Sequence, residues 1–319
     1  MSQLKTHMLR IAILDDYQNV ALDSADWSPL AGRATLTVFN DHLSDADKIV
    51  ERLAPFDVVS IMRERTPLSR DILARLPQLK LIASTGPRNA SIDLAAAADY
   101  NIDVMNTGYD SSPTVELTWA LILASARNLI SETASVRSGG WQRTVGDGIR
   151  GKVLGILGLG NIGSAVAHIR RAFGMDVIAW SENLVPEKAQ ERGARWVPKD
   201  ELFRHADILT IHLVLSSRTR GLVGKSELGL MKPSARLVNA SRGPIVDEAA
   251  LVDALRERQI AGAAIDVFHS EPLPQDHPLR QLETVVTTPH IGYVSRDLYR
   301  IFYQDTVANI VVWLREKAL

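Results

Sequence analysis

The chain has 319 residues, 46% of them hydrophobic, and its 36 Lys and Arg residues nearly balance its 37 Asp and Glu residues. The formal net charge of -1 argues against nucleic acid or an anionic membrane surface as a partner, and the absence of cysteine excludes disulfides, a cysteine nucleophile and thiolate metal sites. We therefore expect a protein that binds a small molecule, holds no metal and has two domains, since domains usually contain about 100–200 residues.

Signals for export or membrane insertion are missing from the sequence. Residues 1–8 (MSQLKTHM) lack the apolar core of a signal peptide, and the longest uncharged helical stretch, between Glu116 and Arg127, has ten residues. A membrane-spanning helix needs about 20. The sequence predicts a soluble, cytoplasmic protein, and the lack of cysteine agrees with a reducing compartment.

Apolar strand-like runs alternate with helical patterns through residues 9–105. We predict strands at Leu9–Leu14, Val58–Met62, Leu79–Ser84 and Asp103–Met105, and helices at Asp45–Leu53, Ser69–Arg75 and Ile92–Tyr100. This alternation is typical of βαβ units around a parallel sheet. Asp15-Asp16-Tyr17 follows the first strand without a glycine-rich turn, so we do not expect this domain to hold a nucleotide.

Two strand ends of this first domain have the composition of binding loops. Ser84-Thr85-Gly86-Pro87-Arg88-Asn89 places a glycine, backbone amides and a cation at a carboxyl end, where open α/β sheets bind ligands. Thr85, Gly86 and Arg88 are therefore candidate substrate residues, although Arg88 alone is equally well read as a solvated cation. Arg63-Glu64-Arg65-Thr66 follows another strand, and its arginines either contact a second polar group or are solvated loop charges.

A turn-rich segment, residues 106–110 (NTGYD), marks the predicted domain boundary. Ser112 and Pro113 then read as an N-cap and first helical residue, opening a long helix whose apolar residues run to Leu129. Ser138-Gly139-Gly140-Trp141 ends that helical stretch.

The strongest signal is an apolar strand, Val153–Leu157, that runs into a G-x-G-x-x-G turn. Gly158 allows the tight turn, Gly160 lets the backbone approach a pyrophosphate, and Gly163 lets the helix Ser164–Phe173 pack closely. That helix directs its N–H groups at the phosphates. The strand Asp176–Trp180 completes a βαβ unit, so we interpret the turn as dinucleotide-binding rather than purely structural. The predicted cofactor contacts in it are Gly158, Gly160, Asn161, Ile162 and Gly163.

The end of the next strand bears on the choice between NAD and NADP. NAD-specific dinucleotide sites have an acid there, which binds the adenosine ribose and repels a 2′-phosphate. This chain has Ser181 at that position, followed by Glu182, and no arginine follows immediately. Either Glu182 binds the ribose or it points to solvent. We predict NAD as the cofactor and keep NADP open, with Ser181 and Glu182 as cofactor-binding residues.

The remaining pattern completes a second parallel sheet. Strands are predicted at Ile208–Leu213, Arg236–Asn239, Ala261–Ile265 and Thr284–Val286, with helices near Lys199–His205, Lys225–Met231 and Asp247–Arg256, and a last helix at Ser295–Lys317. We predict an α/β protein of two doubly wound parallel-sheet domains. A flavodoxin-like substrate domain (residues 1–106 plus 293–319) would carry an inserted, six-stranded Rossmann cofactor domain (residues 107–292).

Three late strands end in polar loops that contain Arg242, Glu271 and His290. Carboxyl ends of neighbouring parallel strands lie side by side, so these side chains should converge. Hydride transfer to a carbonyl needs a proton donor, and histidine suits that task near neutral pH. A carboxylate fixes the tautomer of the histidine, and an arginine fork polarises a 2-keto acid. Taken singly, each residue also fits a surface or structural role.

These residues, together with the glycine turn, match the pattern of a known family. The chain resembles the D-isomer-specific 2-hydroxyacid dehydrogenases, which include glyoxylate/hydroxypyruvate reductases and D-lactate, phosphoglycerate and formate dehydrogenases. The resemblance runs over nearly the whole chain, with specific blocks at residues 151–163, 239–251 (NASRGPIVDEAAL) and 262–292.

The resemblance implies an NAD(P)-dependent enzyme that interconverts a 2-keto acid and its D-2-hydroxy acid. It implies that Arg242 binds the carboxylate and carbonyl of the substrate, that His290 is the acid/base and that Glu271 is its partner. It also implies that Asp266 holds the nicotinamide amide, and that backbone N–H groups of the Ser84–Asn89 loop bind the substrate carboxylate. A homodimer with the helix from Pro113 as interface arm is implied as well.

Several alternatives remain at this stage. Formate dehydrogenases have glutamine where this chain has Glu271, which argues against formate as substrate. A phosphorylated or phosphonate acid is a second possibility for the substrate. A dinucleotide-sensing corepressor of the same fold is the alternative outside the enzymes, and it can retain Arg242, Glu271 and His290.

Overall fold

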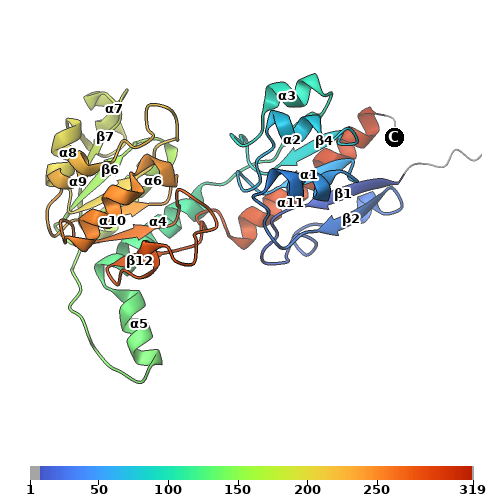
Figure 1. The fold of residues 1–319 in the computed structure, drawn as a ribbon. Helices are drawn as coiled ribbons and strands as arrows, with labels where there is room; N and C mark the ends of the chain where they lie inside the picture. Colours follow the sequence, from blue (N-terminus) through green and yellow to red (C-terminus); the bar gives the residue numbers. More distant parts are fainter. Residues whose placement is uncertain (1–7, 318–319) are drawn as a thin grey trace, which may run out of the picture. The chain divides into compact units, whose positions relative to one another are not determined.

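The computed structural model describes residues 8–317 and divides the chain into two compact units (Figure 1). Unit 1 comprises Met1–Asp110 together with Val294–Leu319, and unit 2 is the continuous segment Ser111–Tyr293. The chain therefore leaves unit 1, forms the whole of unit 2, and returns. We describe each unit by itself.

Unit 1 is built around a five-stranded parallel sheet with the order β2-β1-β3-β4-β5. The strands are β1 (Leu9–Ile13), β2 (Ala34–Val38), β3 (Val58–Ile61), β4 (Leu81–Ser84) and β5 (Asp103–Asn106). This order is that of the flavodoxin-like doubly wound fold, which confirms the predicted fold class. The sequence pattern missed β2, because this edge strand (ATLTV) is only partly buried and its residues alternate with polar ones.

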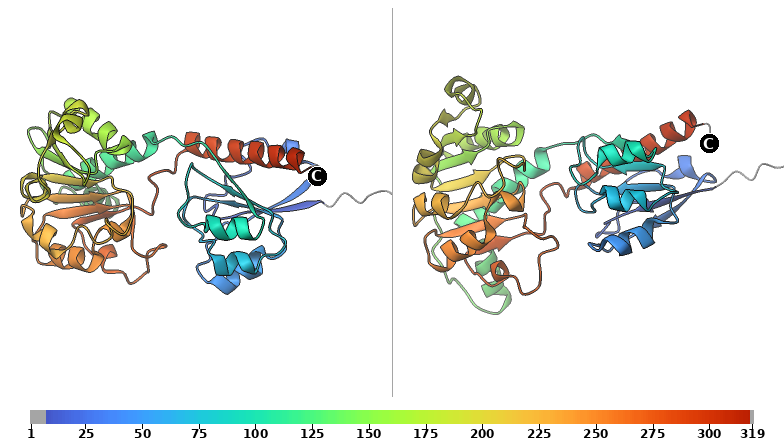
Figure 2. Two further views of the ribbon diagram at one scale, coloured as in Figure 1. Left: turned by 90° about the horizontal axis from the view of Figure 1, so that it is seen from above. Right: turned by 45° about the horizontal axis from the view of Figure 1, so that its top comes forward.

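Helices cover both faces of the unit 1 sheet (Figure 2). On one face lie α1 (Ala46–Leu53), α2 (Arg70–Ala74) and α3 (Leu94–Asp99), whose buried residues form one core with β1, β3 and β4. The other face is covered by the short helix η1 (Ser28–Leu30) and by α11 (Arg296–Glu316). Phe302 of α11 is fully buried, and the Trp313 indole N–H donates to Asp103 Oδ2 at 2.7 Å.

Unit 2 contains a seven-stranded parallel sheet with the order β12-β11-β10-β9-β6-β7-β8. Its strands are β6 (Val153–Leu157), β7 (Asp176–Trp180), β8 (Arg195–Trp196), β9 (Ile208–Ile211), β10 (Arg236–Asn239), β11 (Gly262–Ile265) and β12 (Val285–Thr287). The reversal of strand order beside β6 is that of a Rossmann sheet. The predicted count of six strands was wrong by one, because β8 is a two-residue strand too short to leave a pattern.

Each face of this sheet has its own hydrophobic core. One core contains residues of α8 (Lys199–His205), α9 (Lys225–Leu230) and α10 (Glu248–Arg256), and the other contains residues of α4 (Ser112–Ala126), α6 (Asn161–Phe173) and α7 (Pro186–Glu191). Two short helices, η2 (Gly243–Ile245) and η3 (Pro278–Arg280), lie in the loops after β10 and β11. Loops therefore follow the carboxyl ends of these two strands.

The single long helix predicted from Ser112 to the break at Ser138 is two helices. Asn128 adopts a left-handed conformation (φ 50°), which ends α4 at Ala126 and begins α5 (Leu129–Arg137). The predicted N-cap was also one residue late, because Ser111 is the cap and its carbonyl accepts from the N–H groups of Thr114 and Val115. Asparagine tolerates the left-handed region better than most residues.

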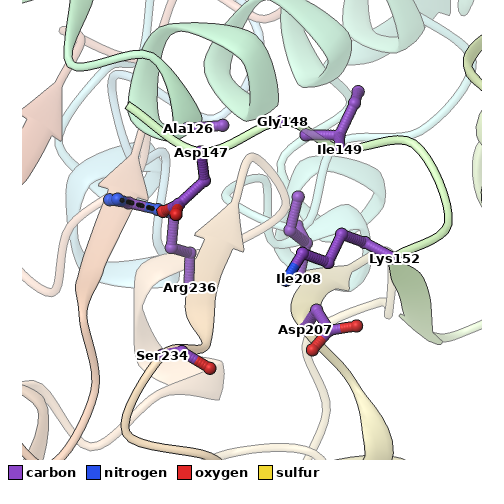
Figure 3. Close-up of a pocket in the computed structure, with 9 residues that line it drawn as sticks. All are labelled: Ala126, Asp147, Gly148, Ile149, Lys152, Asp207, Ile208, Ser234 and Arg236. Carbon is purple, nitrogen blue, oxygen red and sulfur yellow. Dashed lines mark hydrogen bonds and ion pairs between the residues drawn. The ribbon is translucent and has the colours of Figure 1, made fainter. Parts of the chain in front are cut away.

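The segment after α5 is tied by polar contacts to α5 and to the rest of unit 2. Figure 1 shows α5 and residues 138–148 projecting from the rest of unit 2. Glu132 accepts from the N–H groups of Arg143 and Thr144, at 3.2 and 2.7 Å. Asp147 then pairs with Arg236 at 3.1 Å beside a cavity of about 30 Å³ (Figure 3). That volume holds about one or two waters and is too small for a nucleotide. The ion pair beside it attaches the loop to the rest of unit 2.

Candidate active site

The glycine turn of unit 2 has the geometry that a bound phosphate requires. Gly158 has φ +103°, and a Cβ placed there would lie 2.7 Å from the carbonyl oxygen of His212. A Cβ on Gly163 would lie 2.2 Å from the Gly158 carbonyl oxygen, so any side chain would push α6 away from β6. At Gly160, in contrast, a Cβ would meet nothing within 4 Å. The turn is closed toward the protein and open outward.

The first turn of α6 supplies donors to this open side. Gly160 is the N-cap and makes no side-chain cap, and α6 carries two basic residues in its last turn and no acid in its first. The first N–H groups of a helix have no partner within it, and the helix dipole adds partial positive charge there. Residues 160–163 therefore fit the pyrophosphate of a dinucleotide, which would supply a hydride-carrying nicotinamide to the site.

The end of β7 lies directly beside this turn. The Gly158 N–H donates to the Trp180 carbonyl at 2.9 Å, and Ser181 is the next residue. Ser181 is partly buried, whereas Glu182 is exposed. The structure thus places Ser181 where a ribose-binding acid would stand.

A functional candidate that the sequence pattern did not reveal also reaches the turn. Arg192, the C-cap of α7, donates from Nη1 to the carbonyl of Leu159, which lies between Gly158 and Gly160. In the sequence Arg192 is eleven positions after Ser181, and only the reversal of the chain through α7 brings it back. A helix signal at Val185-Pro186 was the available clue to that reversal.

Asp266 organises the loop that carries His290. The carboxylate is fully buried after β11 and accepts from Thr288 Oγ1 at 2.6 Å and from the N–H groups of Ile291 and Gly292, both at 2.9 Å. Burial raises the pKa of Asp266, although these hydrogen bonds and the nearby His290 act in the opposite direction. Both carboxylate oxygens are thus engaged with the loop, so the contact to the nicotinamide amide stays a prediction.

His290 and Glu271 form a close pair. His290 Nδ1 lies 2.5 Å from Glu271 Oε2, and their side chains are 20% and 33% exposed. Glu271 Oε1 accepts from the Phe268 N–H at 2.8 Å. Burial raises the pKa of Glu271, but the hydrogen bond and charge of His290 outweigh it, so the net pKa lies below its usual range. A carboxylate on Nδ1 assigns a proton to that nitrogen and leaves Nε2 for proton transfer.

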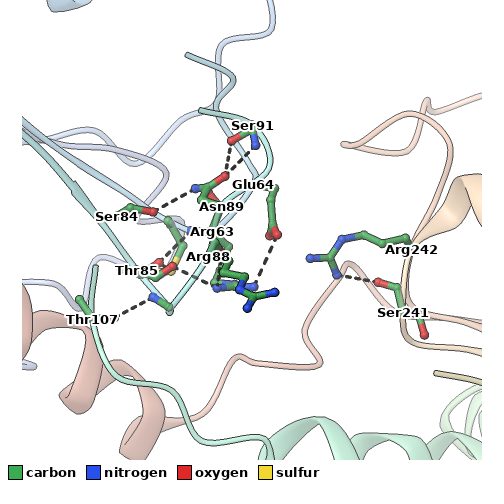
Figure 4. Close-up of polar contacts among 12 residues, drawn as sticks. Arg63, Glu64, Ser84, Thr85, Arg88, Asn89, Ser91, Thr107, Ser241 and Arg242 are labelled. Carbon is green, nitrogen blue, oxygen red and sulfur yellow. Dashed lines mark hydrogen bonds and ion pairs between the residues drawn. The ribbon is translucent and has the colours of Figure 1, made fainter. Parts of the chain in front are cut away.

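Arg242 belongs to the same group of loops. It follows β10, which pairs with β11, which pairs with β12, so Arg242, Glu271 and His290 follow three adjacent strands. A Cβ on Gly243 would lie 2.1 Å from the Phe268 carbonyl oxygen, which shows how closely the first two loops pack. The Arg242 guanidinium donates to the Ser241 carbonyl at 2.8 Å (Figure 4), and its charge helps to lower the pKa of Glu271.

In unit 1 the first backbone amides of the loop after β4 are held by residues of the neighbouring segments. The Thr85 N–H donates to the Ile61 carbonyl at 3.2 Å, and the Gly86 N–H donates to Thr107 Oγ1 at 2.7 Å. Those two amides are therefore engaged within the unit. Arg88 is exposed, and within residues 8–317 its side chain forms no ion pair.

Arg63 is built into the same loop, as Figure 4 shows. Its Nη1 donates to the carbonyls of Thr85 at 3.1 Å and Arg88 at 3.4 Å, and it crosses Gly86 so closely that a Cβ there would overlap it at 1.7 Å. Asn89 donates to the Arg63 carbonyl at 2.6 Å. Of the two arginines after β3, Arg63 thus shapes this loop, whereas Arg65 donates to the Asp15 carbonyl at 2.7 Å.

Comparison with known proteins identifies the family. The profile described as "D-isomer specific 2-hydroxyacid dehydrogenase, NAD binding domain" matches residues 119–292, more than half of the chain. The chain belongs to this dehydrogenase family. It is therefore an oxidoreductase whose cofactor is NAD, with NADP left open.

Individual relatives agree with this D-2-hydroxyacid dehydrogenase assignment. A glyoxylate reductase of Aeropyrum pernix is 43% identical over 257 residues, 77% of this chain and 77% of the relative. A D-3-phosphoglycerate dehydrogenase of Methanocaldococcus jannaschii is 40% identical over 250 residues, but these are only 47% of that protein. The crystal structure of a phosphoglycerate oxidoreductase from Vibrio cholerae O395 superposes with a TM-score of 0.92 at 39% identity, covering 97% of this chain and 100% of the other.

In residues 8–317 of this dehydrogenase no helix is both long and apolar enough to cross a membrane.

The glycine turn allows a matched pair of substitutions. Gly163→Ala should lower the free energy of unfolding by about 1–3 kcal/mol, because its methyl group would overlap the Gly158 carbonyl. Gly160→Ala should cost less than about 1 kcal/mol but weaken dinucleotide binding, because its methyl group would fill the open side. Urea unfolding and calorimetric titration with NADH measure the two effects. Equal loss of stability in both variants would contradict this account of the turn.

His212, which packs against Gly158, should make stability depend on pH. Burial lowers the pKa of His212 to about 4 from 6.5, so the unfolded chain binds more protons between these values. The stabilisation is complete above pH 6.5 and is lost as the pH falls toward 4. In His212→Gln the slope of the unfolding free energy against pH should be smaller by up to about one proton in this window. Parallel slopes in urea titrations of the two proteins would refute the assignment.

Proposed function

We propose that this chain reduces a 2-keto acid to its D-2-hydroxy acid, and catalyses the reverse, with His290 as acid/base. The observation that carries the proposal is the Glu271–His290 pair, 2.5 Å apart, on a loop adjacent to that of Arg242. In this proposal unit 2 is the cofactor domain and unit 1, with the Thr85–Arg88 loop, is the substrate domain. The intact acid/base pair and the named relatives favour an enzyme over a dinucleotide-sensing corepressor.

The proton step follows from the geometry of the pair. When bound, the nicotinamide supplies a hydride to the carbonyl carbon. The carbonyl oxygen gains the electron pair of its broken π bond and takes a proton from His290 Nε2. Glu271, whose pKa is lowered, stays ionised on Nδ1 and stabilises the imidazolium before transfer. In the oxidation direction the same nitrogen accepts the proton.

Arg242 is the proposed anchor of the substrate. A guanidinium offers a planar fork that matches a carboxylate and an adjacent carbonyl oxygen. Since Thr85 and Gly86 already donate their amides within unit 1, we propose that the substrate contacts of this loop come from the N–H groups of Arg88 and Asn89. Thr85 and Gly86 then act by shaping the loop.

The substrate class is proposed from size and charge. The relatives named glyoxylate reductase favour a small, unphosphorylated 2-keto acid such as glyoxylate or hydroxypyruvate. The relatives named phosphoglycerate dehydrogenase keep a phosphorylated acid as the second candidate, and the exposed cation Arg88 is the observation in its favour. We propose the cytoplasm as the place of the reaction, which the absence of cysteine fits.

We also propose a homodimer, formed through α5 rather than through α4. Val115, Trp119 and Ile122 of α4 are buried in the core of unit 2. Large apolar side chains are instead exposed on α5 and the loop after it, at Leu129, Ile130, Val136, Trp141 and Val145. A set of exposed apolar side chains on one projecting arm is typical of an interface.

Kinetics of a single variant test the acid/base role. His290→Gln should lower kcat by about 10²–10⁴, the usual contribution of general acid catalysis. Initial rates of NADH and NADPH oxidation against glyoxylate, hydroxypyruvate, pyruvate and phenylpyruvate provide the measurement. His277→Gln is the control, because His277 forms a similar pair with Glu248 at 3.0 Å outside the proposed site. Unchanged kcat in His290→Gln, or an equal loss in the control, would remove His290 from the reaction.

Charged substitutions on the arm test the dimer. The double variant Ile130→Glu, Val136→Glu should sediment at half the mass of the parent. A dimer of this variant would have to bury unpaired carboxylates in the proposed contact, which is costly. Leu94→Glu, an equally exposed apolar position on α3, should keep the parent's mass. A monomeric parent would refute the proposed interface.

A further inference from the structure

Arg192 carries a positive charge to the glycine turn, and the acid on which it acts electrostatically is its exposed chain neighbour Glu191. Within residues 8–317 its side chain donates to the Leu159 carbonyl and forms no ion pair. A guanidinium has five N–H donors, so this contact leaves most of them available. A partly buried cation beside a phosphate-binding turn is suited to an anion that arrives with the ligand.

NADP(H) has two anionic groups that would come near such a turn, the pyrophosphate and the 2′-phosphate. The pyrophosphate fits the amides of residues 160–163 at the start of α6, which need no arginine. Arg192 instead lies at the end of α7, which follows β7, and the end of β7 is where a dinucleotide fold reads the adenosine ribose.

Ser181, the residue that follows β7, carries no negative charge that would repel a 2′-phosphate. Ser181 and Leu159 each follow one member of the hydrogen-bonded neighbours Trp180 and Gly158, so they flank the same point of the turn. Ser181 is partly buried and is neutral, and the side chain of Glu182 is exposed. An acid at the position of Ser181 would exclude a 2′-phosphate, and a serine hydroxyl can donate to one.

We propose that Arg192 and Ser181 form a binding site for the 2′-phosphate of NADP(H), so that the chain accepts the phosphorylated dinucleotide and binds it more tightly than NAD(H). This inference rests on the proposed dinucleotide function of unit 2. It makes Arg192 a specificity-determining residue with no part in the transfer of hydride or proton.

Fragments of the two cofactors test the site without catalysis. Titration calorimetry of the whole chain with 2′,5′-ADP and 5′-AMP should show tighter binding of 2′,5′-ADP. Arg192→Ala should weaken 2′,5′-ADP about 10- to 100-fold, the usual value of charge-assisted hydrogen bonds to phosphate, and leave 5′-AMP within about twofold. Arg195→Ala removes an exposed arginine three positions later and should change neither affinity.

Two further variants keep the test decisive if Arg192→Ala folds poorly. Arg192→Lys should retain part of the preference for 2′,5′-ADP, because it keeps the charge and loses the fork. Ser181→Asp should abolish the preference and preserve 5′-AMP binding. Equal affinity of the parent for both nucleotides, or a parallel loss of both in Arg192→Ala, would overturn the 2′-phosphate site alone. Failure of the parent to bind either nucleotide would overturn the dinucleotide function as well.

Discussion

The buried carboxylate of Asp266 fixes the part of unit 2 on which the chemistry depends. It is fully buried after β11 and accepts three hydrogen bonds from the loop after β12, two of them from backbone N–H groups. A buried acid without these partners would be costly, so the loop and the acid stabilise each other. His290 lies in that loop with a left-handed backbone (φ 52°), and its ring contacts Glu271.

The same logic of strand ends accounts for what the sequence could predict. The G-x-G-x-x-G turn, the buried strands before Asn239 and Asp266, and the adjacency of their loops all follow from local pattern and from the rules of parallel sheets. Those features are short in sequence and each residue has a steric or chemical reason, as the 2.2 Å approach of a Gly163 Cβ to Gly158 illustrates. Fold class and the grouping of Arg242, Glu271 and His290 were therefore accessible in advance.

Other features depended on tertiary structure and left no local signal. The break between α4 and α5 depends on one left-handed residue, Asn128, inside an otherwise helical pattern. Strand β8 has two residues and exists because β7 offers it an edge. Arg192 reaches the glycine turn only because α7 is short and reverses the chain, so a search of the residues just after Ser181 could not find it. The hydrogen bonds of the Thr85 and Gly86 amides to Ile61 and Thr107 could not be predicted either, because they depend on how the strands of unit 1 pack.

The division of unit 1 into two stretches of chain has a consequence for synthesis on the ribosome. The first 110 residues contain the whole five-stranded sheet, but the long helix that covers one of its faces, α11, is made after all of unit 2. Until Phe302 and Trp313 emerge, only the short helix η1 is available to cover that face, whereas unit 2 is continuous and can complete its cores beforehand. Domains generally fold as units during synthesis, and exposed apolar surface favours aggregation. During this interval unit 1 is incomplete although unit 2 can be complete, so the uncovered apolar face of the unit 1 sheet is the part of the nascent chain most exposed to aggregation.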